Sequence, residues 1–153
     1  MIIILKNKYT LQVDEFFFKC SVGKNGFTKK KIEGDKKTPK GTFDLEHLYY
    51  RKDRLDKPHT SLKCIEISKN MGWCNDVEYP KKYNQLVNTQ NKLKCEKLKR
   101  YDYKYDLFIP IKYNFINPKV GIGSAIFIHL TKDYKPTAGC IALSKKDFFI
   151  MLK

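Results

Sequence analysis

Arginine, tryptophan and long apolar runs are scarce in this sequence of 153 residues. Only three of its 31 basic side chains are arginines, and no apolar run approaches the roughly 18–20 residues that a membrane-spanning helix needs. Arginine is the preferred residue for reading bases and for bidentate contacts to phosphate. The composition therefore excludes a protein anchored by a spanning helix and disfavours one that reads nucleic-acid sequence.

Lysine supplies the remaining positive charge. The chain carries 28 lysines against 16 acidic residues, and its formal net charge is +15. Such a charge concentrates anions near the surface, whether nucleic acid, acidic lipid headgroups or carboxylate-rich substrates. Because the lysines are spread almost evenly along the chain, we interpret them as a solvated surface and expect no nucleic-acid partner.

Closely spaced cysteine pairs are also missing. The five cysteines contain no C-x-x-C, and His47 and His59 have no ligand partners at useful spacing. Structural zinc and thioredoxin-like redox chemistry are therefore disfavoured, and we expect neither metal nor cofactor. The odd count leaves at least one thiol unpaired, which suits a reducing compartment.

The N-terminal run Met1–Leu5 is too short for the apolar core of a signal peptide and is expected to be the first strand. The sequence leaves two locations open. Either the protein stays in the cytosol, or an export segment is absent from this chain.

The hydrophobic pattern predicts one domain over residues 1–153, mainly of β-strands with one or two helices. Ser124–Leu130 is nearly all apolar, which indicates a strand buried on both faces. Ser144 begins a cap-like motif before a terminal helix, and Gln85–Arg100 is a weaker helix candidate. The other predicted strands are Ile2–Leu5, Thr10–Val13, Phe16–Val22, Thr42–Tyr50, Ser61–Ser68, Tyr105–Tyr113 and Cys140–Leu143.

The stretch from His129 to Cys140 offers the parts of a cysteine nucleophile site. An imidazole near a thiol lowers the thiol pKa, and the amides of Gly139 and Cys140 can donate to an oxyanion. Glycine before the cysteine also permits close approach of a substrate. The spacing alone leaves a plain alternative, a small buried cysteine and a core histidine.

Several motifs, in order along most of the chain, resemble the YkuD-like L,D-transpeptidase catalytic domain. Pro136-Thr-Ala-Gly-Cys-Ile-Ala-Leu-Ser144, behind Gly123-Ser-Ala-Ile-Phe-Ile-His129, is similar to the active-site signature of that family. Gly34-Asp-Lys-Lys-Thr-Pro-Lys-Gly-Thr-Phe43 resembles its G-D-x-x-T-P-x-G-x-F loop. Further blocks that resemble one branch, with G-C-I-A-L at the cysteine, are Tyr50–Arg54, Gly72–Asp76 with Tyr83-Asn84, and Tyr101–Asp106.

The resemblance implies a mainly β catalytic domain of the sandwich or barrel type that performs cysteine acyl transfer on peptidoglycan stem peptides or muropeptides. Cys140 would be the nucleophile and His129 the general base, oriented by a backbone carbonyl instead of an acid. Thr137 stands where the family has Ser or Thr, two residues before Gly139. The location of the family implies the cell envelope.

Two departures from the commoner family pattern concern the pocket. Ala142 stands where that pattern has arginine, and the interval from His129 to Cys140, 11 residues, is shorter. If the arginine helps to shape the pocket or holds a substrate carboxylate, a lysine elsewhere must replace it. The sequence does not choose among transpeptidation, hydrolysis of the same bond by an L,D-carboxypeptidase, and a non-catalytic basic binding module.

A polar and aromatic block is the remaining candidate for substrate binding. Trp73, Asp76, Tyr83 and Asn84 either line the cleft or form a packed loop in which Asp76 is a turn residue.

Overall fold

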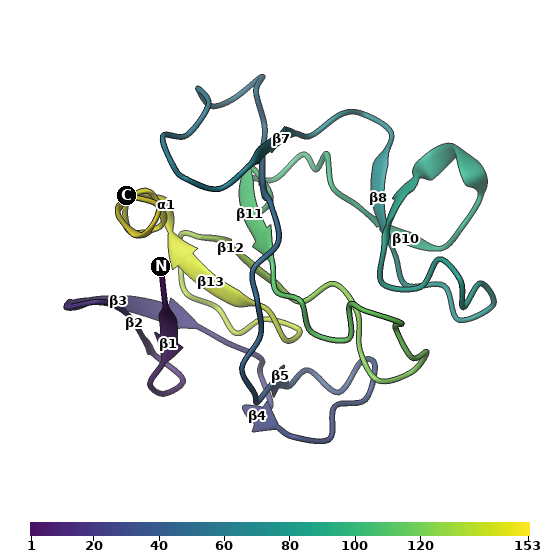
Figure 1. Ribbon diagram of the computed structural model, residues 1–153, viewed down its shortest axis with the longest axis horizontal. Helices are drawn as coiled ribbons and strands as arrows, with labels where there is room; N and C mark the ends of the chain where they lie inside the picture. Colours follow the sequence, from purple (N-terminus) through teal and green to yellow (C-terminus); the bar gives the residue numbers. More distant parts are fainter.

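The computed structural model describes residues 1–153, and strands of one large sheet dominate it (Figure 1). The sheet has eight strands in the order β1-β2-β3-β13-β12-β11-β6-β7. The pairs β12–β13 and β6–β7 are parallel, and the other pairs are antiparallel. The strands are β1 (Ile3–Leu5), β2 (Thr10–Val13), β3 (Phe16–Ser21), β6 (Leu48–Tyr50), β7 (Cys64–Glu66), β11 (Leu107–Pro110), β12 (Phe127–Thr131) and β13 (Ile141–Ser144).

Two smaller sheets and a terminal helix complete the fold. Figure 1 shows β8 and β10 on one side of β11, and α1 on the other. A three-stranded sheet has the order β10-β8-β9, and β4 pairs with β5 in parallel. The bounds are β4 (Phe27–Thr28), β5 (Thr38–Pro39), β8 (Met71–Cys74), β9 (Leu86–Asn88), β10 (Cys95–Lys97), the 3-10 helix η1 (Thr89–Asn91) and α1 (Lys145–Met151).

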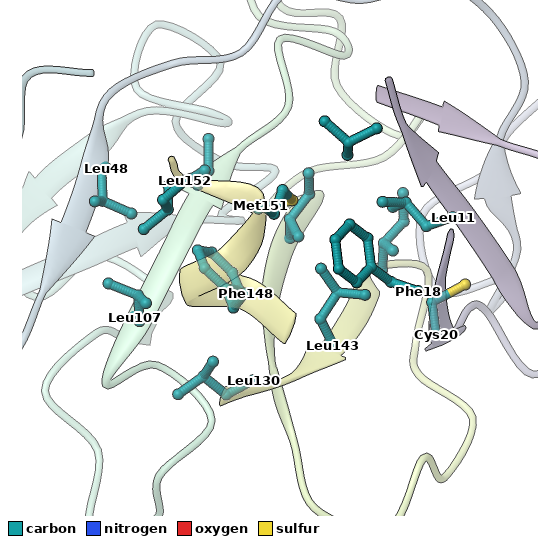
Figure 2. Packing of buried hydrophobic residues seen from close by; sticks show 14 of the residues in the cluster. Leu11, Phe18, Cys20, Leu48, Leu107, Leu130, Leu143, Phe148, Met151 and Leu152 are labelled. Atoms are coloured by element: carbon teal, nitrogen blue, oxygen red, sulfur yellow. The ribbon is translucent and has the colours of Figure 1, made fainter. Parts of the chain in front are cut away.

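The central strands are apolar on both faces because each face packs against its own core. Alternate residues of a strand point to opposite faces. One face, which includes Ile128 and Leu143, packs with Phe148 and Met151 of α1 in a cluster of 16 buried residues (Figure 2). The opposite face contributes Phe108, Phe127 and Cys140 to a second cluster of eight. This confirms that the predicted Ser124–Leu130 strand is buried on both faces.

The terminal helix is also confirmed. The Ser144 hydroxyl accepts a hydrogen bond from the amide of Asp147 at 3.1 Å, as an N-cap does. No helix of the structure is long and apolar enough to cross a membrane.

The prediction of a helix over Gln85–Arg100 is wrong. This segment forms β9, η1 and β10, and the two strands pair with opposite edges of β8. Asn88 caps the short η1, and Lys92 adopts a left-handed conformation that ends it. The apolar residues of the segment form no helical stripe, so tertiary pairing with β8 decides its structure.

Candidate active site

Strand register places His129 and Cys140 on the same face of the large sheet. In the parallel pair β12–β13, His129 is opposite Ala142, and Ile128 is opposite Ile141. Cys140 immediately precedes β13 and, two residues before Ala142, faces the same side as the histidine. Both side chains line one pocket of about 600 Å³. The sheet thus brings together the two residues that the sequence singles out.

Backbone groups of the segment before β12 hold the Cys140 thiol. Sγ donates to the carbonyl of Ala125 at 3.3 Å and accepts from the amide of Phe127 at 3.3 Å. Cys140 is 8% exposed. Burial raises the pKa of this thiol to about 12, and the negative charge of Glu96 acts in the same direction. The thiol is therefore protonated at neutral pH in the free protein.

The His129 ring is held by its own strand. Nδ1 lies 2.9 Å from the carbonyl oxygen of Leu130. Since a carbonyl only accepts, Nδ1 carries the proton, and Nε2 keeps a free lone pair. Burial lowers the pKa of His129 to about 4, and the charges of Lys104 and Arg100 lower it further. The ring is neutral at pH 7, with its basic nitrogen available.

The resting pair differs from the expectation that the imidazole keeps the thiol partly ionised. The structure has no hydrogen bond between His129 and Cys140, and burial disfavours the charged form of both groups. Ionisation of Cys140 therefore requires proton transfer to a base, and Nε2 of His129 is the unoccupied base in the pocket.

Thr137 and Gly139 shape the turn that presents Cys140. The Thr137 hydroxyl donates to the carbonyl of Cys140 at 2.6 Å and accepts from the amide of Gly139 at 3.1 Å. The amide of Gly139 is thus occupied, whereas that of Cys140 donates to no group of the protein. Of the two amides expected to stabilise an oxyanion, the free one is that of Cys140.

The loop that resembles G-D-x-x-T-P fixes this turn from the other side. The Thr38 hydroxyl donates to the carbonyl of Gly139 at 2.9 Å and accepts from the amide of Gly23. Gly139 has φ 142°, and a Cβ there would lie 2.9 Å from the carbonyl oxygen of Lys37. Glycine is required because the loop approaches so closely.

None of the four predicted residues of the polar and aromatic block lines this pocket. Trp73 and Asn84 are buried, and the indole nitrogen donates to Asn84 Oδ1 at 2.8 Å. That oxygen also accepts from the amide of Ala125 at 2.9 Å, whose carbonyl receives the Cys140 thiol. Trp73 and Asn84 therefore position the segment that holds the thiol.

The other two residues of the block have supporting contacts. The Tyr83 side chain is fully buried, and its hydroxyl donates to Glu33 Oε2. Asp76 accepts from the amides of Glu78 and Lys94 at 3.0 and 2.8 Å, which matches the alternative interpretation of a turn residue.

The pocket is also lined by charged residues that the sequence analysis did not single out. Lys31 and Glu33 come from the loop between β4 and β5, and Glu96 and Arg100 from β10 and the residues after it. The Arg100 guanidinium lies 5.0 Å from the Tyr105 ring and contacts Glu96. Their sequence neighbourhoods are rich in lysine and acid, so only the fold distinguishes them from surface charges.

A comparison with protein families is consistent with this arrangement. Residues 2–151 match the family model of the YkuD L,D-transpeptidase catalytic domain. The chain therefore belongs to this family, whose members are generally enzymes that act on peptidoglycan peptides. Its mainly β fold agrees with that membership. Comparison with curated proteins and with solved structures finds no match.

Proposed function

We propose that this protein is a cysteine acyl transferase of the L,D-transpeptidase type, with residues 1–153 as one catalytic domain and peptidoglycan stem peptides as substrate. The observation that carries the proposal is the shared pocket, which Cys140 and His129 both line. The thiol supplies the nucleophile, the amide a free donor and Nε2 a free base. These are the groups that acyl transfer requires.

The first half-reaction transfers the acyl group to the enzyme. Cys140 Sγ attacks the carbonyl of the L-centre residue of a tetrapeptide stem, while its proton passes to Nε2 of His129. The Cys140 amide donates to the oxyanion of the tetrahedral intermediate. The C–N bond then breaks, protonated His129 gives its proton to the departing amine of D-alanine, and a thioester remains on Cys140.

The neutral resting pair suits this sequence of steps. Ionisation of Cys140 is costly in the free protein, so the thiol reacts only slowly with ambient electrophiles before substrate fills the pocket. When the carbonyl of the substrate lies beside the Cys140 amide, the thiolate attacks its carbon as the proton leaves the thiol. His129, with a lowered pKa, returns the proton readily to the leaving amine.

The acceptor in the second half-reaction decides the product. A side-chain amine of another stem gives a cross-link, and water gives a tripeptide. Thr137, Trp73 and Asn84 act in this proposal as positioning residues for Cys140, and Tyr83 and Asp76 support the adjoining loop.

Product analysis tests the proposal. Purified protein is incubated with a disaccharide-tetrapeptide, and the products are identified by mass spectrometry beside a Cys140→Ala control. We expect release of D-alanine, with either a cross-linked dimer or a tripeptide, from the wild type only. Equal product from Cys140→Ala, or none from folded wild-type protein, would contradict it.

A further inference from the structure

Lys31 is a buried cation beside the turn that presents Cys140. Its side chain is 3% exposed, and it lines the same pocket as Cys140 and His129. Nζ lies 3.5 Å from the point where a Cβ on Gly139 would be. Lysine is rarely buried to this degree, because removing an ammonium from water is costly. Its placement therefore needs an electrostatic reason.

Two glycines make room for this side chain. At Gly123, φ is 106° and a Cβ would lie 2.8 Å from Cε of Lys31. At Gly139, φ is 142° and the same ammonium is in contact distance. The first glycine precedes β12 and the second precedes Cys140. The Lys31 side chain therefore packs against both glycines, and a side chain at Gly123 or Gly139 would displace it.

The ammonium is only partly neutralised by the protein. Nζ donates to Asp35 Oδ1 at 2.7 Å, and its other two N–H groups have no partner within the chain. Asp35 also accepts from the amides of Ile32 and Lys37, which divides its charge among three donors. A buried ammonium with free donors is suited to a second anion.

We propose that Lys31 is the cation that stabilises negative charge on Cys140 when the thiol ionises. Lys31 brings its charge to this turn from the loop between β4 and β5. The inference rests on the proposed function, in which Cys140 reacts as a thiolate.

The surroundings of Cys140 agree with this role. Burial raises the pKa of the thiol, Glu96 raises it further, and Lys31 is the charged side chain that lowers it. Within the pocket, the other ionisable groups around Cys140 come from four segments. They are Glu33 on the β4–β5 loop, Glu96 on β10, Arg100, Tyr103, Lys104 and Tyr105 between β10 and β11, and His129, Asp133 and Lys135 on and after β12.

The alkylation rate of Cys140 tests the proposal without any peptide substrate. Full-length protein reacts with iodoacetamide at pH 8, and the Cys140 peptide is quantified by mass spectrometry, with the half-buried Cys64 as internal reference. Only the thiolate reacts. Lys31→Met should slow alkylation of Cys140 about tenfold, and Lys31→Arg should retain at least part of the rate. Lys30→Met, at the exposed neighbouring lysine, should leave it unchanged.

A second variant keeps the test decisive if Lys31→Met does not fold. Asp35→Asn removes the counter-charge and leaves Lys31 in place, so it should accelerate alkylation of Cys140. Loss of packing alone would not produce opposite changes in the two variants. A folded Lys31→Met protein that reacts at the wild-type rate, or an Asp35→Asn protein that does not react faster, would overturn the proposal. Because no stem peptide is present, this outcome is independent of whether D-alanine release is observed.

Discussion

At the residue scale, both groups proposed for the chemistry are kept uncharged by burial. The pKa of Cys140 is raised to about 12, and that of His129 is lowered to about 4. A neutral thiol and a neutral imidazole do not need counter-ions. Cys140 belongs to an apolar cluster with Phe108 and Phe127, and the His129 ring packs edge-on against Tyr105 of the same cluster. In the proposed mechanism their reactivity depends on transfer of the thiol proton to Nε2 of His129, which has no partner in the protein.

The lowered pKa of His129 makes stability depend on pH. Unfolded protein binds a proton at this residue with a pKa near 6.5, whereas the folded protein binds it near 4. The free energy of unfolding is therefore greatest above pH 6.5 and declines as the pH falls toward 4, by about 3 kcal/mol from this residue. Urea unfolding at pH 7 and pH 4 should show this loss in the wild type beyond that in His129→Gln. An equal loss in both proteins would contradict the assignment.

Some residue-level features were accessible from sequence and others were not. The nearness of His129 and Cys140, and the turn at Gly139, follow from short motifs whose chemistry is local. The resemblance also implied that a carbonyl orients the histidine, and Leu130 supplies one. The raised pKa of Cys140 and the burial of Lys31 were not accessible, because both depend on segments that are distant in the sequence.

At the element scale, the three-stranded sheet supports the large one through Asn84. Its Oδ1 accepts from Trp73 on β8 and from the amide of Ala125, and its Nδ2 donates to the carbonyls of Tyr113 and Asn114. The Asn84 side chain thus joins β8 to the loop after β11, at Tyr113 and Asn114. It also joins β8 to the segment before β12, where the carbonyl of Ala125 accepts the Cys140 thiol. Asn84 also has φ 55°, a conformation that asparagine tolerates well.

Removal of this side chain should weaken the fold. Asn84→Gly keeps the backbone conformation accessible and leaves the Trp73 indole and the Ala125 amide without partners, which should lower the free energy of unfolding by about 3 kcal/mol. Asn117→Gly is the matched control, because Asn117 is exposed, has φ 52° and makes no side-chain hydrogen bond. Urea unfolding of both variants measures the difference. Similar stability of the two variants would show that the network carries no such weight.

Strands were easier to predict than the segment from Gln85 to Arg100. Ser124–Leu130 and the terminal helix have strong local patterns, and the structure has both. The segment predicted as a helix has few apolar residues, of which Leu98 is fully buried and Leu86 is 40% exposed. Its strands exist because β8 offers two edges for pairing, and a local pattern does not contain that information.

At the scale of the whole molecule, the two faces of the large sheet have separate tasks. One face packs with α1 and forms the larger apolar cluster. The other carries His129 and Cys140 at the border between an aromatic cluster and a charged pocket. Lys31, Lys104 and Lys135 line this pocket, and the net charge of the chain is +15. In the proposed function, a surface of this sign attracts stem peptides, because they carry several carboxylates.

The most direct test of the account is to locate the acyl intermediate. The wild-type protein is mixed with a disaccharide-tetrapeptide, quenched in acid within the first turnover, and digested for peptide mapping by mass spectrometry. The account predicts that the stem peptide without its D-alanine is attached through a thioester to Cys140, and that hydroxylamine releases it. An adduct on another residue, or release of D-alanine with Cys140 unmodified at every quench time, would contradict the account.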